Sequence, residues 1–187
     1  MVEKLRRFNI SSLEHTFAKF RANAETQEAV DTLESVASGE SDRQFILLYG
    51  ATGCGKTHLI EATVIAWAQR GIGSRYQTFS EIARHLKSSL RNPPEYEIYF
   101  KNLCDAERLI IDDFGSGTTE SRFEVSDLED IIDTRYRRRY YPTKQVTILA
   151  SNKDIKELPD RVISRFFDPE FGSVVCMGNV DYRRRKV

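Results

Sequence analysis

The chain has 187 residues, a length that suits one domain or two at most. It carries 28 Lys and Arg against 28 Asp and Glu, and this zero net charge excludes a surface that attracts polyanions everywhere. Apolar residues make up 40% and charged residues 30%, which is typical of a globular domain and excludes a disordered chain.

Signals for secretion, membrane insertion and disulfide bonding are not evident in the sequence. The N-terminal segment Met1–Arg7 is charged and no apolar stretch follows it, so we expect no secretory signal. The longest apolar run, Phe45–Tyr49, is far shorter than the roughly 20 residues of a membrane helix. The cysteines, Cys54, Cys104 and Cys176, are scattered and form no C-x-x-C pair. We therefore expect a cytoplasmic protein with reduced thiols.

Apolar spacing predicts helices and short buried strands in alternation along the chain. Residues 1–22 give no clear pattern, so we divide the chain into an N-terminal extension with a helix at 1–40 and a core domain at 41–187. Alternation of this kind favours an α/β fold: a mostly parallel five-stranded sheet with helices on both faces. The expected helices are 25–38, 57–70, 80–90 with Ser80 as a candidate cap, Pro93 to about Leu103, 124–139 and 160–167; the strands are 45–49, 75–79, 108–111, 146–150 and 173–177.

A glycine-rich loop joins the first expected strand to the next helix. Gly50-Ala51-Thr52-Gly53-Cys54-Gly55-Lys56-Thr57 fits the phosphate-binding pattern G-x-x-x-x-G-K-[ST]. Backbone amides of such a loop surround phosphates at a helix N-terminus, and the alternative is a glycine turn without a ligand. Lys56 is expected on the β- and γ-phosphates and Thr57 on Mg²⁺. The predicted nucleotide-binding residues here are Gly50, Thr52, Gly53, Cys54, Gly55, Lys56, Thr57 and His58.

Two adjacent carboxylates, Asp112 and Asp113, follow the apolar run Leu109–Ile111. Burying carboxylates is costly unless they bind a cation, so we predict that Asp112 lies at the Mg²⁺ ion. Asp113 would then act as the general base on the attacking water. Taken alone, such a pair is more often a turn or a helix cap.

Three polar residues later in the chain are further catalytic candidates. Asn152 follows the strand at 146–150 and could contact the γ-phosphate and orient water, unless it only forms a turn. Arg161 and Arg165 are four residues apart, on one face of a helix. A guanidinium suits the charge of a phosphoryl-transfer transition state, whereas solvated surface arginines are the alternative.

A GTPase is a weaker interpretation of the same residues. Asp112-Asp113-Phe114-Gly115 fits the D-x-x-G of GTPases, and Asn152-Lys153 fits the start of their N-K-x-D. The guanine-binding aspartate would fall at position 155, where Ile155 stands, and Asp154 is one residue early. An isoleucine side chain cannot accept the guanine N–H bonds.

Two basic clusters are candidate contacts for single-stranded DNA. Arg84, Lys87 and Arg91 share one face of the helix if it continues over 80–91, and could follow a phosphate backbone. Arginines and tyrosines alternate through Arg135–Tyr141, which includes Arg137 and combines charge with stacking surfaces. The second cluster equally suits a subunit interface or a solvated helix end.

Taken together, the motifs resemble the AAA+ ATPases of the DnaC/DnaI helicase-loader type, to which the transposition helper IstB is closely related. The resemblance covers about Phe17 to the C-terminus and rests on Gly50–Thr57, Ile110–Gly115, Ala150–Asn152 and Arg161–Arg165. The ending Val180–Arg183 is also similar to the loader tail.

This resemblance implies a P-loop NTPase fold of the AAA+ type, with the helical lid domain expected to be absent. It implies that Asn152 is the sensor-1 residue. Arg165 would be the arginine finger, acting on ATP held by a neighbouring subunit, with Arg161 supporting it. The helices at 80–103 would correspond to the insertion that faces single-stranded DNA in relatives.

The function implied is that of an ATPase, with ATP and Mg²⁺ as cofactors, which loads or remodels a DNA-replication partner. The partner expected first is a replicative helicase. Turnover is expected to be slow and stimulated by self-association. An IstB-like transposition helper and an ATP-gated adaptor that does not hydrolyse ATP remain open, because Asp113 stands where many AAA+ proteins have Glu and is about one methylene shorter.

Overall fold

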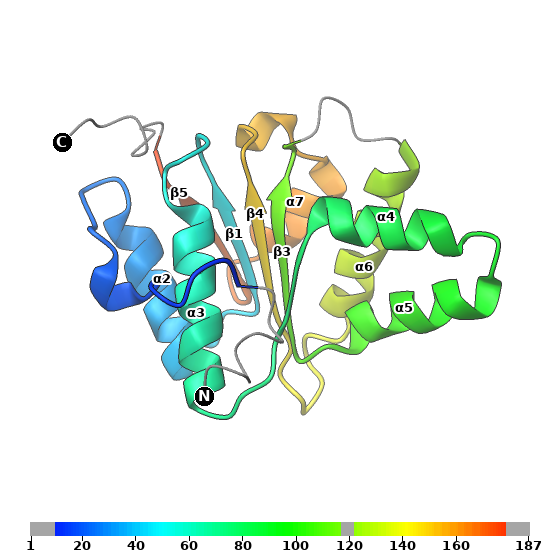
Figure 1. Cartoon of the computed structure of the whole chain (residues 1–187), viewed down its shortest axis with the longest axis horizontal. Coiled ribbons are helices and arrows are strands. Elements are labelled where there is room, and N and C mark those ends of the chain that lie inside the picture. The colour runs from blue at the N-terminus through cyan, green and yellow to red at the C-terminus, as the bar shows by residue number, and fades with distance from the viewer. Residues whose placement is uncertain (1–9, 117–121, 179–187) are drawn as a thin grey trace.

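The computed structural model describes residues 10–116 and 122–178 of the chain. Within these ranges the protein forms a five-stranded sheet in the order β2-β3-β4-β1-β5, with every neighbouring pair parallel (Figure 1). The predicted α/β fold with a parallel five-stranded sheet is therefore confirmed. The strands are β1 Phe45–Tyr49, β2 Arg75–Thr78, β3 Arg108–Phe114, β4 Val146–Ser151 and β5 Gly172–Cys176.

Helices cover both faces of the sheet, as the alternating pattern predicted. On one face lie α2 (Gln27–Ser38) and α3 (Lys56–Gln69), whose side chains share one apolar cluster. The other cluster contains α4 (Phe79–Ser89), α5 (Pro93–Asp105), α6 (Arg122–Arg137) and α7 (Asp160–Phe166). Short 3₁₀ turns occur at η2 (Phe17–Lys19) and η3 (Ile155–Glu157). No helix in the described ranges has the length and apolar character needed to cross a bilayer.

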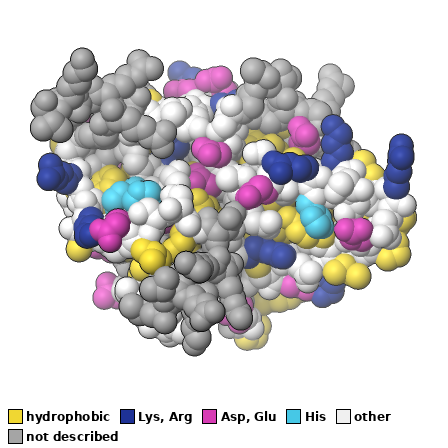
Figure 2. All heavy atoms as spheres, in the orientation of Figure 1, with side chains coloured by type: hydrophobic (Ala, Val, Ile, Leu, Met, Phe, Trp, Pro, Cys, Tyr) yellow, Lys and Arg dark blue, Asp and Glu magenta, His cyan; other side chains and the backbone are white. Residues whose placement is uncertain are grey.

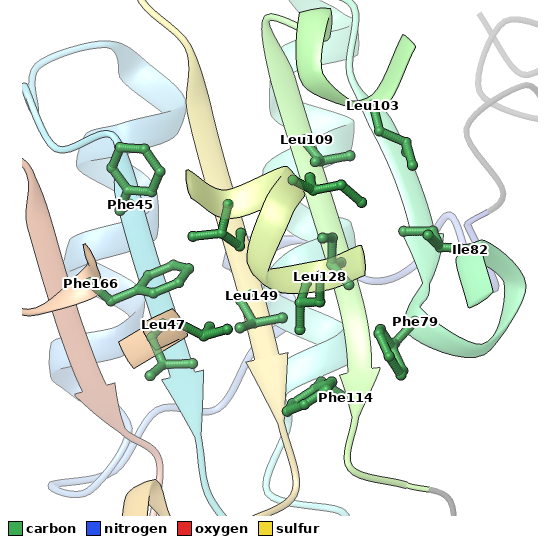
Figure 3. Packing of buried hydrophobic residues seen from close by; sticks show 14 of the residues in the cluster. Phe45, Leu47, Phe79, Ile82, Leu103, Leu109, Phe114, Leu128, Leu149 and Phe166 are labelled. Atoms are coloured by element: carbon green, nitrogen blue, oxygen red, sulfur yellow. The ribbon is translucent and has the colours of Figure 1, made fainter. Parts of the chain in front are cut away.

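The central strands are apolar throughout because both of their faces are covered. All residues of β4 and all but the last of β1 are buried. Figure 3 shows Phe45, Leu149 and Phe166 among the side chains that fill the space between the sheet and the helices on the α6 side. Because β1, β3 and β4 are neighbours and parallel, their carboxyl ends meet at one edge, where the predicted site residues follow.

The cap of α4 differs from the expectation. Thr78, not Ser80, is the N-cap: its side chain accepts a hydrogen bond from the backbone N–H of Glu81 at 3.2 Å. Glu81 in turn accepts one from the Thr78 N–H at 2.9 Å. This reciprocal capping box places the N-cap two residues before Ser80 and the first helical residue at Phe79, and T-x-x-E is a signal visible in the sequence.

The burial of Arg135 is the main correction to the predicted basic surface at Arg135–Tyr141. Its side chain is fully buried between α6 and β4, so it offers no contact to nucleic acid. The guanidinium donates to the carbonyls of Leu103, Cys104 and Ala106 at the end of α5, to Val146 O and to Thr147 Oγ1. Burial lowers the pKa of Arg135 to about 10, so the group stays charged at neutral pH.

Candidate functional site

The loop Gly50–Gly55 leaves β1 and enters α3 with backbone angles that only glycine adopts readily. Gly55 has a φ of 104°, and a Cβ atom there would come within 2.6 Å of the Phe20 ring. Gly50 has a φ of 150°, and its Cβ would approach Gly178 O at 2.7 Å. The glycines at these positions are therefore required both by conformation and by close packing.

Lys56, the first residue of α3, is buried beside this loop. Its Nζ donates to Gly50 O at 2.8 Å and to Ala51 O at 2.9 Å, and lies 3.6 Å from Cys54 Sγ. Backbone carbonyls thus hold the ammonium within the curve of the loop. A buried cation positioned in this way suits a ligand with several negative oxygens.

Asp112 of β3 reaches the loop through a hydroxyl. Thr57 Oγ1 donates to Asp112 Oδ2 at 3.0 Å, and Tyr76 of β2 donates to the same oxygen at 3.1 Å. The backbone N–H of Asp113 donates to Oδ1 at 2.8 Å. Burial and the neighbouring Asp113 raise the pKa of Asp112, while the three donors oppose that shift. Sequence reasoning missed Tyr76, because its contact depends on the register of β2 with β3.

Asp113 occupies a strained position at an irregularity in the pairing of β3 with β4. Its φ is 59°, the only positive value among non-glycine residues in the described ranges. Asn152, which follows β4, contacts Asp113 Oδ1 at 3.3 Å and donates to Ser116 Oγ at 2.8 Å. The structure thus brings together Asp113 and Asn152, and strain of this kind is common at functional sites.

His58 faces away from the loop. Its Nε2 lies 3.0 Å from Thr16 O, its ring stacks on His15 with centroids 4.4 Å apart, and burial lowers its pKa. His15 contacts Glu61, a fully buried residue of α3 that also accepts the Ser11 N–H at 2.7 Å. His58 and Glu61 therefore attach the segment before α2 to α3, the helix that follows the glycine-rich loop.

Arg161 and Arg165 lie on α7, and each contacts α6. Arg165 donates through Nε and Nη2 to Asp133 Oδ1, at 3.1 and 2.7 Å, and lies over the Tyr136 ring. Arg161 is 82% exposed and lies 3.5 Å from a Glu129 oxygen. Because α7 and α3 pack into different clusters on opposite faces, the structure does not bring these arginines together with the loop residues.

Only two of the three basic residues predicted to share a helix face lie on α4: Arg84 and Lys87 belong to the helix, and Arg91 follows its end at Ser89. Arg84, Lys87 and Arg91 are all exposed, and Figure 2 shows Lys and Arg side chains gathered over α4. Arg137 at the end of α6 is also exposed but pairs with Asp133 at 2.7 Å. The loader-like ending Val180–Arg183 lies outside the described residues.

The oxygen atoms of Asp112 and Thr57 are ligands of the kind that hard cations such as Mg²⁺ take. In residues 10–116 and 122–178, no group of three or more His, Cys, Asp or Glu side chains could hold a metal by itself. Mg²⁺ needs fewer protein ligands, because it keeps waters and binds substrate phosphates beside one or two oxygen ligands. The Thr57 hydroxyl and the Asp112 carboxylate supply oxygens of that kind.

The sheet order, the glycine loop after β1 and the acidic end of β3 together define a P-loop NTPase core of the AAA+ type. The profile described as IstB-like ATP binding protein matches residues 3–165. The chain belongs to this family.

Proteins similar to this chain in sequence or structure include replication initiators and a helicase loader. The chromosomal replication initiator protein DnaA of Acinetobacter baumannii is 29% identical over 160 residues, covering 81% of this chain and 32% of DnaA. AMPPCP-bound DnaA from Aquifex aeolicus has a TM-score of 0.71 at 24% identity, covering 89% and 50% of the two chains. The DnaC helicase loader has a TM-score of 0.71 at 18% identity, covering 88% and 97%. The chain spans about a third of the length of the curated relatives it matches.

Proposed function

We propose that the chain binds Mg²⁺-ATP at the loop Gly50–Thr57 and hydrolyses it while loading or remodelling a DNA-replication partner. The observation that carries this proposal is the convergence of the loop and β3: Thr57 Oγ1 lies 3.0 Å from Asp112 Oδ2, and Lys56 lies buried in the loop. These residues are 55 positions apart in the sequence, yet they form one polar site at the carboxyl edge of the sheet.

Each residue has a distinct role in this proposal. Lys56 exchanges its loop carbonyls for β- and γ-phosphate oxygens, and the loop amides bind the remaining oxygens. When bound, Mg²⁺ neutralises phosphate charge, and Thr57 and Asp112 hold it. Asp113 accepts a proton from the attacking water, and Asn152 orients that water from the neighbouring strand end. GTP is disfavoured because Ile155 offers no acceptor and Asp154 is used to cap η3.

A replicative helicase is the partner that we propose first. The similarity to a protein named as a helicase loader and to replication initiators supports a partner in replication. The exposed cations Arg84 and Lys87 on α4, with Arg91 in the turn after it, support weak contact with single-stranded DNA, and Arg137 is a further contact. An IstB-like transposition helper is the alternative that the family itself suggests.

An adaptor that binds ATP without turning it over is a second candidate. The observation that favours it is the contact of Asn152 with the Asp113 carboxylate at 3.3 Å, which occupies one oxygen of the proposed base. The Asp side chain is also about one methylene shorter than Glu. Multiple-turnover phosphate release, with and without single-stranded DNA, separates the two candidates.

Lys56→Ala tests the binding site. The substitution removes a cation that contacts two phosphates, so we expect ATP affinity to fall by about 1.5–3 kcal/mol, the scale of charged hydrogen bonds. Isothermal titration calorimetry with Mg²⁺-ATP measures this loss. Lys156→Ala is the matched control, because Lys156 is an exposed lysine of η3 and its removal should leave affinity unchanged. Equal affinities for parent and Lys56→Ala would exclude this nucleotide site.

Mixing two inactive variants tests whether Arg165 acts on a neighbouring subunit. Arg165→Ala keeps its own phosphate loop, and Lys56→Ala keeps its own arginine. Each alone is expected to be nearly inactive, whereas a mixture regains partial activity at junctions that pair an intact loop with an intact arginine. Phosphate release is titrated at concentrations where the parent assembles, with co-assembly followed by light scattering. No gain in a co-assembled mixture would leave Arg165 as the partner of Asp133 only.

A further inference from the structure

Tyr76 of β2 belongs to the polar site, although no sequence motif includes it. We propose that Tyr76 is a positioning residue that fixes which oxygen of Asp112 is available to Mg²⁺. This inference rests on the proposed function, since it concerns the same metal carboxylate. Its basis is the hydrogen bond from the Tyr76 hydroxyl to Asp112 Oδ2 at 3.1 Å.

The lone pairs of the Asp112 carboxylate are almost all engaged within the protein. Oδ2 accepts from both Thr57 and Tyr76, which uses its two in-plane lone-pair positions. Oδ1 accepts from the Asp113 N–H, which leaves one lone-pair position on that oxygen. With the Tyr76 hydroxyl in place, the carboxylate presents one oxygen in one orientation to a metal ion or its bound water. Without it, Oδ2 has one free position, and the carboxylate then has two, one on each oxygen.

Strand register explains why Tyr76 reaches Asp112. Tyr76 pairs with Ile110, and Thr78 pairs with Asp112, in the parallel ladder of β2 and β3. Side chains alternate between the faces of a strand, so Tyr76, Ile110 and Asp112 all point to the α3 face. The carboxylate therefore lies diagonally ahead of the tyrosine, within reach of its hydroxyl.

Burial makes this contact rigid and strong. Tyr76 is 8% exposed and Asp112 is 1% exposed, so water scarcely competes for the hydrogen bond between them. The Tyr76 ring packs in the apolar cluster beneath α3 with Trp67 and Ile110, which holds the hydroxyl in place. The low local dielectric strengthens this hydrogen bond relative to one in water, at an O···O distance of 3.1 Å.

Tyr76→Phe tests the inference, because it removes only the hydroxyl and keeps the packed ring. Binding of a fluorescent ATP analogue is titrated with Mg²⁺ for parent and variant, and repeated in EDTA. We expect the Mg²⁺ concentration at half-saturation to rise by about 10- to 100-fold, the range for loss of a group that orients a metal ligand. Affinity for the analogue in EDTA should stay the same, because the lost hydroxyl bonds to Asp112 and the ring that packs in the apolar cluster is kept.

Tyr99→Phe is the matched control. Tyr99 is also 8% exposed and donates its hydroxyl, to Gln77 Oε1 at 3.1 Å, but on the α5 side of the sheet. Its loss should leave the Mg²⁺ titration unchanged. An equal rise in both tyrosine variants would attribute the effect to general destabilisation and overturn the inference.

A double substitution tests whether Tyr76 acts through Asp112. In the Asp112→Asn background, Tyr76→Phe should change Mg²⁺ half-saturation by less than about twofold, because the two residues form one unit. A larger further change would overturn the inference. A parent-like Mg²⁺ titration for Tyr76→Phe, with analogue binding lost in Lys56→Ala, would overturn the role of Tyr76 and leave the proposed function standing. Failure of the parent to bind the analogue would overturn both.

Discussion

Arg135→Met is expected to lower the free energy of unfolding by about 3 kcal/mol or more, with denaturation by urea as the measurement. The side chain of Arg135 is fully buried, and its five hydrogen bonds include three to carbonyls at the C-terminal end of α5. Each buried acceptor left without a donor costs about 1–3 kcal/mol. Cys104 O and Ala106 O still accept from the Gln145 amide, so the loss falls on Leu103 O, Val146 O and Thr147 Oγ1, and together it exceeds that of an ordinary core substitution.

Arg137→Met is the control for this prediction. Arg137 lies two residues further along α6, is 79% exposed, and pairs with Asp133 across one helical turn. An exposed pair of this kind contributes about 0.3–0.5 kcal/mol, so the control should unfold close to the parent midpoint. Equal losses in the two variants would mean that the hydrogen bonds of Arg135 contribute nothing beyond a surface ion pair.

Asp113→Asn is expected to reduce ATP turnover by about 10²-fold or more while leaving nucleotide affinity unchanged. Asn lacks the charge that a general base needs. It keeps an oxygen for the contact with Asn152, now 3.3 Å, and it tolerates the left-handed backbone at φ 59°. The variant therefore separates chemistry from folding. Phosphate release measures turnover, and calorimetry measures affinity.

Asp154→Asn controls for loss of a carboxylate near the same edge of the sheet. The Asp154 side chain caps η3 by accepting the Lys156 N–H at 3.0 Å, a role that Asn performs as well. Its turnover should match that of the parent. If Asp113→Asn also hydrolysed ATP at the parent rate, another group would have to be the base, and the site would lose its proposed chemistry.

Local patterns in the sequence determined much of the fold. Strands β1 and β4 are buried on both faces, so they appear as continuous apolar runs, and glycine or proline marks the ends of several helices. The predicted ends of β1 match the observed ones, and the other predicted helix and strand ends lie within three residues of those observed. The largest difference is in β3, which continues past Ile111 to Phe114 because Phe114 pairs with Ser151 beyond the irregularity.

The sequence by itself also placed the candidate site, since the loop Gly50–Thr57 and Asp112-Asp113 are contiguous motifs whose chemistry depends on spacing along the chain. What it could not determine was which residues from other strands join them. Tyr76 reaches Asp112 only because β2 pairs with β3 in one register, and a shift of one residue would turn its ring to the opposite face.

The same limit explains the basic residues around the end of α6. Arg135 and Arg137 are nearly adjacent in the sequence and have the same charge, yet one is fully buried and the other 79% exposed. Helical geometry turns them to different sides, and only the arrival of α5 and β4 supplies the carbonyls that make burial of Arg135 favourable. Local periodicity determined the elements, and contacts between distant segments decided which charges support the fold and which face solvent.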